Sequence, residues 1–221
     1  MMKSLFIAIG IALPLVSGDG VKKPVQTTAT ERFDFAAGGL IRLSDSYGDL
    51  SIEGWDKPEV EIVVTKSLPR YYTAQEMEKT KDRLANVNVV AQKNSGSEMT
   101  ISTSAKKRRG VTIEYQIRVP RDSRLSIHHS GGNILVSNVT GDIEATSRNG
   151  DIMLMLPGTG RYAIDARSKI GTVASDFDGE GHVRHLVGER FAAASSGQAR
   201  RIFLRMAFGG ITIKAVPAGA Y

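Results

Sequence analysis

The acidic residues in the middle of the sequence are the first candidates for chemistry. Asp142, Glu144 and Asp151 lie within ten residues of one another, and a pair of carboxylates on one surface is what hydrolysis of a glycosidic bond requires. A stack of short strands would bring Asp142 and Asp151 together on a groove, as in polysaccharide-degrading enzymes of the parallel β-helix type. However, an Asp after a Gly at the entrance of a strand is typical of a turn, in which the side chain bonds to backbone groups. We favour the turn interpretation and keep the enzyme as an alternative.

Metal sites and nucleophiles have weaker support. His128 and His129 are adjacent, and successive side chains of a strand point to opposite faces, so the two rings cannot bind one ion together. His182 and His185 have a spacing that suits a helix better than a strand, and no Cys or carboxylate cluster accompanies them. The chain has no cysteine and no Ser in a G-x-S-x-G phrase. We therefore expect no catalytic residue, no metal and no cofactor.

Basic residues are concentrated in two segments of a chain whose formal net charge is +6. One segment contains the consecutive residues Lys106, Lys107, Arg108 and Arg109. The other runs from residue 190 to residue 221 and has five basic residues and no acidic one. Such patches favour polyanions such as lipopolysaccharide, anionic lipid or acidic polysaccharide, although they also keep a protein soluble. The four consecutive basic residues, with Asp142 and Asp151, form the predicted ligand surface.

A short repeated phrase indicates how these side chains are positioned. Gly132-Asn133-Ile134, Gly141-Asp142-Ile143 and Gly150-Asp151-Ile152 follow one another at intervals of nine residues. Each unit is typical of a short strand that begins after a glycine turn, and a single strand of this kind cannot bury its apolar side alone. We therefore predict an all-β, single-domain β-solenoid, or β-helix-like stack of short strands. Ile134, Ile143 and Ile152 should point into its core.

Two further elements are marked clearly in the sequence. The longest alternating run spans residues 111–119 and predicts a strand that buries Val111, Ile113, Tyr115, Ile117 and Val119. Residues 73–84 have Thr73 and Glu76 at the spacing of a capping box and a narrow apolar stripe. We expect one short surface helix there, covering an end or edge of the sheet. Strand-like segments then recur every nine to eleven residues up to residue 216.

The N-terminal segment has the form of a secretory signal. Lys3 precedes an apolar run over residues 5–16, and small or compact residues at 16–18 resemble a cleavage site. We expect a signal peptide over 1–18, a flexible leader over 19–30 and the β-solenoid domain over 31–221. No later window approaches the roughly 20 apolar residues of a membrane span. The mature chain is thus predicted to be exported, either to the periplasm or to the exterior and cell surface.

Several of these phrases together resemble a known family. They are the early Gly48-Asp49-Leu50-Ser51-Ile52-Glu53-Gly54-Trp55-Asp56 segment, the strand at Glu59-Val60, the segment from Tyr115 to Pro120 and the serial Gly-Asp-Ile units. With the signal peptide, they resemble the bacterial putative-adhesin family over about residues 33 to 216. The resemblance implies a β-helix-like fold, export and no known catalytic residues. This chain lacks the lipid-anchoring cysteine of some members, which favours a free exported form.

These observations lead to one principal functional hypothesis. We expect a non-enzymatic exported adhesin or binding protein whose repetitive β surface meets a cell-surface glycan or an envelope protein, and no nucleic acid. Trp55 and Tyr47 could stack on a sugar ring, although a lone tryptophan beside a turn is more typically a cap on the core. The alternatives are a polysaccharide-degrading enzyme with a carboxylate row and a structural component of the cell envelope.

Overall fold

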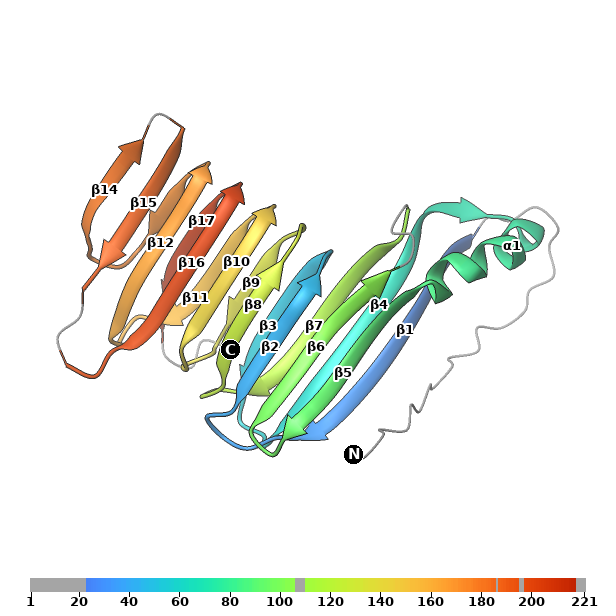
Figure 1. Ribbon diagram of the computed structural model, residues 1–221, viewed down its shortest axis with the longest axis horizontal. Helices are drawn as coiled ribbons and strands as arrows, with labels where there is room; N and C mark the ends of the chain where they lie inside the picture. Colours follow the sequence, from blue (N-terminus) through green and yellow to red (C-terminus); the bar gives the residue numbers. More distant parts are fainter. Residues whose placement is uncertain (1–22, 106–109, 186, 195–196, 218–221) are drawn as a thin grey trace.

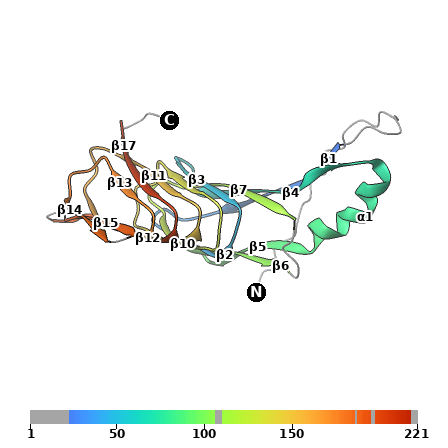
Figure 2. The same cartoon turned by 90° about the horizontal axis from the view of Figure 1, so that it is seen from above.

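The computed structural model describes residues 23–105, 110–185, 187–194 and 197–217. This part of the chain is mostly β-structure, with one helix, α1 (Ala74–Ala85). The strands form two mixed sheets that lie one above the other (Figures 1 and 2). The prediction of an all-β protein is confirmed.

The two sheets have eight and nine strands. In spatial order, the eight-stranded sheet contains β1 (Lys23–Asp34), β4 (Glu59–Tyr72), β7 (Thr112–Pro120), β3 (Asp49–Trp55), β9 (Ile134–Ser137), β11 (Ile152–Pro157), β17 (Ile211–Val216) and β13 (Val173–Ser175). The nine-stranded sheet contains β14 (Glu180–His185), β15 (Gly188–Ala193), β12 (Tyr162–Ile170), β16 (Arg200–Phe208), β10 (Ile143–Asn149), β8 (Arg124–His129), β2 (Leu40–Ser46), β6 (Glu98–Ala105) and β5 (Val87–Ser95).

Consecutive strands of the repetitive part alternate between the sheets. The pairs β2/β3, β8/β9, β10/β11, β12/β13 and β16/β17 each contribute one strand to either sheet, in the same spatial order. Successive nine-residue units therefore lie in opposite sheets and do not stack directly on one another. The residues that stack in parallel register are eighteen apart, as Ile134 and Ile152 are. Two strands, rather than one, are needed for each layer because each sheet covers the apolar side of the other.

The late strands also depart from the expected order. The last pair, β16/β17, lies between β10/β11 and β12/β13, so the C-terminal segment fills a place inside the stack. β14 and β15 form an antiparallel hairpin that extends the nine-stranded sheet beyond β12. The regular spacing in the sequence thus predicts strands correctly but not their neighbours.

Glycines at the corners explain why the chain can turn so sharply from one sheet to the other. Gly132 and Gly150 have φ values of +108° and +107°, which L side chains rarely adopt. A Cβ on Gly150 would also lie 2.2 Å from the carbonyl oxygen of Gly132, and one on Gly132 would lie 2.2 Å from that of Gly48. The backbones of stacked corners therefore approach too closely for any other residue.

The core lies between the sheets and follows the predicted alternation. Ile134, Ile143 and Ile152 are at most 1% exposed, as expected. The predicted inward set of β7 is also confirmed, since Val111, Ile113, Tyr115, Ile117 and Val119 are all buried. The alternate side chains of β7 are exposed, so each sheet has one face in the core and one face in solvent.

The helix and the first strand lie at the end of the molecule opposite β14 (Figure 1). α1 begins after Thr73, and the capping box between Thr73 and Glu76 is formed, which confirms the predicted helix. Residues 23–30, expected to belong to the leader, are instead part of β1, which pairs antiparallel with β4. This edge strand is rich in threonine, which favours β-structure, but Val25 is the sole buried apolar residue among them. A clear apolar alternation is therefore absent from its sequence.

Candidate functional site

The outer face of the nine-stranded sheet carries the strongest concentration of basic side chains in register. Thr146 on β10 lies beside Arg205 on β16, Arg205 lies beside Arg167 on β12, and Arg167 lies beside Arg190 on β15. Adjacent strands are about 4.8 Å apart, so these side chains form one continuous row across four strands. The row lies on the outer face because the residues between them, such as Leu204 and Ala166, are buried in the core.

One carboxylate neutralises part of this row. Asp165 accepts a hydrogen bond from Arg205 at 2.6 Å and another from Arg190 at 3.2 Å. Partial burial by itself would raise the pKa of Asp165, but the hydrogen bond and charge of Arg205, with a smaller effect of Arg190, hold its pKa below the usual value. The guanidinium of Arg205 also lies 3.8 Å from the ring centroid of Phe203, a favourable cation–π distance. Arg205 is thus fixed in place by its neighbours.

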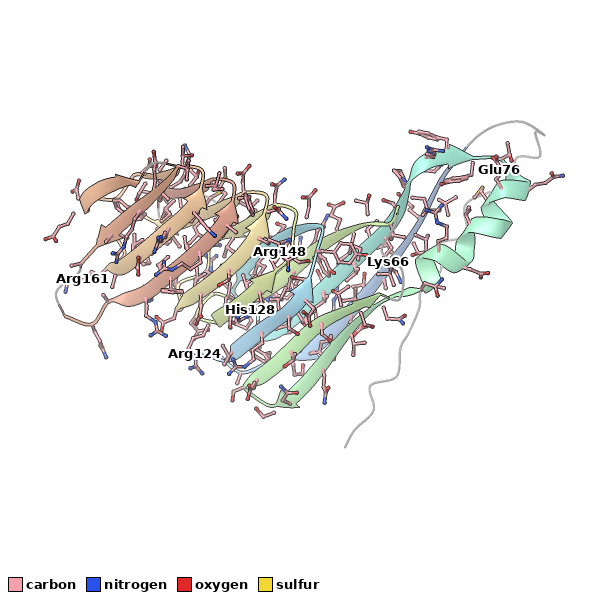
Figure 3. All side chains as sticks on the ribbon, turned by 45° about the horizontal axis from the view of Figure 1, so that its top comes forward. Lys66, Glu76, Arg124, His128, Arg148 and Arg161 are labelled. Carbon is pink, nitrogen blue, oxygen red and sulfur yellow. The ribbon has the colours of Figure 1, made fainter. Side chains whose placement is uncertain are left out.

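Three other cations of this face are available for a ligand. Arg148, Arg167 and Lys169 are exposed, and within the described residues none of them makes an ion pair or a side-chain hydrogen bond. Figure 3 shows Arg148 on β10, on the same face as His128 of the neighbouring strand. Unpaired guanidinium and ammonium groups bind phosphate, sulfate and carboxylate groups through charge-assisted hydrogen bonds.

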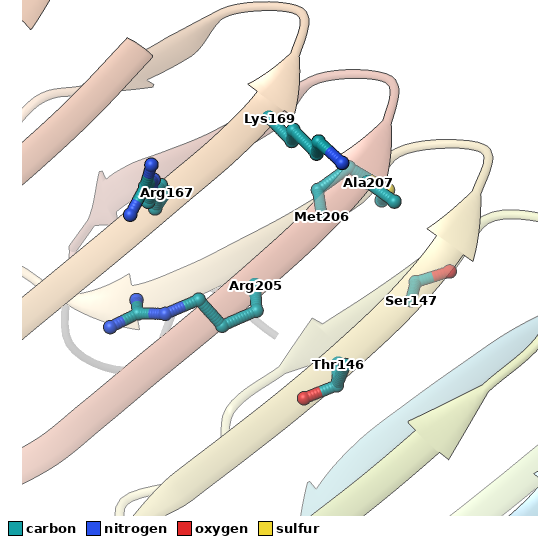
Figure 4. Close-up of a pocket in the computed structure, with 7 residues that line it drawn as sticks. All are labelled: Thr146, Ser147, Arg167, Lys169, Arg205, Met206 and Ala207. Carbon is teal, nitrogen blue, oxygen red and sulfur yellow. The ribbon is translucent and has the colours of Figure 1, made fainter. Parts of the chain in front are cut away.

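A shallow hollow lies beside two of these cations, Arg167 and Lys169. It has a volume of about 330 Å³ and is lined by Thr146, Ser147, Arg167, Lys169, Arg205, Met206 and Ala207. Figure 4 shows that Arg167 and Lys169 come from β12, whereas Thr146 and Ser147 come from β10 on the other side of β16. The hollow has room for one sugar residue or a similar small group, with positive charge on the β12 side and the hydroxyl group of Thr146 on the β10 side. The side chain of Ser147 is buried, and its hydroxyl donates a hydrogen bond to the carbonyl oxygen of Asn149.

The residues predicted to bind a ligand do not come together here. Lys106, Lys107, Arg108 and Arg109 lie outside the described residues. Asp142 precedes β10 in the nine-stranded sheet, and Asp151 precedes β11 in the other sheet. The seven residues of β10 separate them, which corresponds to about 20 Å of extended chain. The expectation that Asp142 and Asp151 lie close together on one groove is therefore wrong.

Both aspartates instead fasten the corners of the stack. Asp142 accepts a hydrogen bond from the backbone N–H of Arg201, and Asp151 accepts one from that of Gly210. Asp49 and Asn133 do the same for the next layer, accepting from the N–H groups of Asn133 and Asp151 respectively. Asp49, Asn133 and Asp151 form a ladder along one corner, and Asp142 holds the opposite one. Both arrangements agree with the turn interpretation of the Gly-Asp units.

The histidines lie as the alternation predicts. His128 is exposed, whereas His129 is buried and its Nδ1 lies 2.8 Å from Oγ of Ser46. The side chains of His182 and His185, on β14, lie outside the described part of the chain. Among the described residues, no three His, Cys, Asp or Glu side chains come together as metal ligands would.

Neighbouring groups hold the side chain of Trp55 in place. Its Nε1 donates a hydrogen bond to the carbonyl oxygen of Glu59 at 2.8 Å, and the cationic groups of Lys57 and Arg118 lie 4.7 and 5.7 Å from the ring centroid. These contacts support a structural role for the indole, in line with the cap interpretation.

The sequence analysis missed Arg148, Arg167 and Lys169 as candidate ligands. The basic segment after residue 190 pointed to this face, because it supplies Arg190, Arg200, Arg201 and Arg205 to β15 and β16. A signal for the others was the spacing of Arg167 and Lys169, since residues two apart on a strand share a face. What the sequence does not contain is the register that places them beside β16.

Comparisons with known proteins support the fold. No model of a known protein family matches the sequence, and no curated protein does. A solved structure of a putative cell adhesion protein from Clostridium sporogenes ATCC 15579 is similar, with a TM-score of 0.52 and 12% identity over 88% of this chain and 100% of that chain. The two proteins share a fold.

Putative adhesins from Parabacteroides distasonis ATCC 8503 and Bacteroides fragilis NCTC 9343 are more distant. The first of these has a TM-score of 0.33 and 11% identity, over 85% of this chain and 65% of that chain. The second has a TM-score of 0.26 and 12% identity, over 85% of this chain and 97% of that chain.

Proposed function

We propose that this chain is an exported, non-enzymatic binding protein of the adhesin type, which presents the outer face of its nine-stranded sheet to an acidic cell-surface glycan. The observation that carries the proposal is the hollow in which Arg167 and Lys169 stand exposed, beside the fixed Arg205. An acidic glycan offers carboxylate or sulfate groups to these cations and hydroxyl groups to Thr146.

The shape of the molecule supports a repetitive binding surface. We propose that the stacked pairs of alternating strands form a two-sided β-solenoid, because each pair repeats the same register with its neighbour. Such stacks present extended surfaces for partners. The C. sporogenes neighbour is described as a putative cell adhesion protein, which agrees with an exported binding role. No helix in the described part of the chain has the length and hydropathy of a membrane span.

The positions of the carboxylates favour binding over hydrolysis. A glycosidase of the usual kind holds its two carboxyl groups about 5 to 9.5 Å apart, whereas Asp142 and Asp151 belong to corners at opposite ends of β10. Each of them also accepts a hydrogen bond from the backbone of a neighbouring strand. The proposal therefore gives both aspartates a structural role.

A glycan-binding experiment with a turnover readout tests the proposal. The chain without residues 1–18 is applied to an array of acidic and neutral glycans, and bound acidic glycans are then incubated with the protein and assayed for new reducing ends. We expect saturable binding to acidic glycans, weakened by salt, with no new reducing ends. Release of reducing ends would favour the enzyme alternative, and binding to neutral glycans alone would contradict the role of the basic hollow.

A further inference from the structure

A stripe of exposed apolar side chains lies beside the basic face. Phe208, at the end of β16, is in register with Ile170 at the end of β12. The backbone N–H of Gly171, the residue after Ile170, donates a hydrogen bond to the carbonyl oxygen of Val187. Val187, Ile170 and Phe208 are 66%, 42% and 49% exposed. Three large apolar side chains, two at the ends of β16 and β12 and one in the turn before β15, therefore stand in solvent along one corner of the molecule.

Two unpaired cations accompany this stripe. The pairing of the flanking residues places Arg148 on β10 and Lys169 on β12 on either side of Ala207. The two side chains thus come from strands about 10 Å apart, with a small residue between them. Lys169 directly precedes Ile170 of the stripe. Arg148 directly precedes Asn149, which pairs with Phe208 of the stripe. The charged row and the apolar stripe run parallel to one another.

Two carboxylates near this corner bond to backbone groups. Glu189, beside Gly188 at the start of β15, accepts a hydrogen bond from the backbone N–H of Val173 at 2.9 Å. Asp151, across the corner, accepts one from the N–H of Gly210 at 2.7 Å. Within the part of the chain that the structure describes, neither Arg148 nor Lys169 makes an ion pair, so both can meet an external anion.

The cations and the apolar side chains of this corner together fit one kind of partner, an anionic lipid surface. A row of Lys and Arg beside exposed aromatic and aliphatic side chains fits the boundary between anionic headgroups and acyl chains of a bilayer. A second copy of this chain fits less well, because three half-exposed side chains offer only a few hundred Å², whereas a stable protein interface needs about 800 Å² from each partner. A bilayer requires no matching shape.

We infer that the corner formed by Val187, Ile170 and Phe208, with Arg148 and Lys169, docks the protein on an anionic lipid surface. The apolar side chains enter the headgroup region and the two cations contact lipid phosphates. The inference goes beyond the proposed glycan binding, because it assigns the apolar stripe, which the glycan hollow does not use. Docking through this corner leaves Arg167 on the sheet face.

Vesicle co-sedimentation tests this inference. The chain without residues 1–18 is incubated with vesicles of phosphatidylcholine alone and with vesicles that contain about 30% phosphatidylglycerol. The probe variant is the double substitution Ile170→Ser and Phe208→Ser. The matched control is Val90→Ser with Met153→Ser, which removes two apolar side chains of similar exposure, 43% and 40%, from other parts of the surface. Circular dichroism confirms that all proteins are folded.

We expect the unmodified protein and the control to bind the anionic vesicles and not the neutral ones, and the probe variant to bind at least about tenfold more weakly. Lys169→Glu should weaken binding to a similar degree. Equal binding by probe and control would overturn the inference, as would an absence of vesicle binding by the unmodified protein. The probe variant should keep its affinity for acidic glycans, so failure of the lipid inference and failure of the glycan proposal are distinguishable.

Discussion

The outer faces of the two sheets are built on the same stack but differ in chemistry. On the nine-stranded sheet, β10, β16 and β12 present Arg148, Arg167, Lys169 and Arg205. At the corresponding places of the eight-stranded sheet, β11, β17 and β13 present Met153, Met155, Thr212 and Ala174, with Lys214 as their basic residue. Because the inner faces are equally apolar, the fold does not dictate this difference. The stack thus supplies two surfaces, and one of them carries most of the cations that can meet an anion.

The largest effect on stability should come from placing a carboxylate on the inner side of a strand instead of its outer side. Ile143 on β10 is 1% exposed, whereas Thr146 on the same strand lies on the outer face. Ile143→Asp would bury an unpaired carboxylate and should lower the free energy of unfolding by about 4 kcal/mol or more. Thr146→Asp should change it by no more than about 0.5 kcal/mol. Urea unfolding of both variants checks this, and a tolerated Ile143→Asp would show that the faces are assigned wrongly.

The next effect concerns the corners that carry the chain from one face to the other. Gly150→Ala places a Cβ against the Gly132 carbonyl oxygen at a φ of +107°. We expect a loss of about 2–4 kcal/mol in the free energy of unfolding. Gly96→Ala is the control, because its Cβ would meet nothing within 4 Å. Thermal unfolding should separate the two variants clearly, and equal melting temperatures would contradict the account of the corners.

A smaller effect is expected for the aspartates of the corners. Asn133 already occupies the position in the ladder that Asp49 and Asp151 occupy in neighbouring layers. An amide oxygen can therefore replace the carboxylate as acceptor, so Asp151→Asn should change the free energy of unfolding by less than about 0.5 kcal/mol. Asp151→Ala, which removes the acceptor, should cost about 1 kcal/mol. Chemical denaturation of both variants tests this, and an equal loss in the two would contradict the ladder.

The smallest expected effect is a dependence of protein stability on pH, caused by the buried ring of His129. Burial lowers the pKa of His129 below the ordinary value of 6.5. The unfolded chain therefore binds the proton more readily, so stability from the neutral ring is fully present above about pH 6.5 and decreases as the pH falls below it. His129→Asn, which can keep the contact with Ser46, should reduce the decrease in melting temperature between pH 7.5 and 5.5. His128→Asn, on the exposed side, should not, and an unchanged pH profile in His129→Asn would refute this explanation.

Local features of the fold could be predicted from the sequence because their causes are local. The alternation of residues 111–119, the capping box at Thr73 and the Gly-Asp turns each depend on a few adjacent residues, and each is present in the structure. The place of β16/β17 inside the stack could not be predicted, because it depends on pairing between segments about sixty residues apart. β1 was missed since its threonines lie on an edge strand with little buried apolar surface.

Only the chemical character of the candidate site, a basic surface for an anionic ligand, was predicted from the sequence. The excess of basic residues after residue 190 indicated an anionic ligand, but Arg148, Arg167 and Arg205 come from three strands whose order is not the order of the sequence. For Asp142 and Asp151, the role in turns was predicted correctly and the position in space was not. Their turn role follows from the residues themselves, whereas their predicted proximity assumed one strand per layer, and the structure has two.

Charge reversal on the two outer faces tests the central claim most directly. Arg167→Glu on β12 and Lys214→Glu on β17 change the net charge equally, and both side chains are exposed. Affinity for heparin and for polygalacturonate is measured by titration calorimetry at several salt concentrations. The account predicts that Arg167→Glu weakens binding at least about tenfold and that Lys214→Glu has little effect. Equal weakening by the two substitutions would show that overall charge, and not the outer face of the nine-stranded sheet, determines binding.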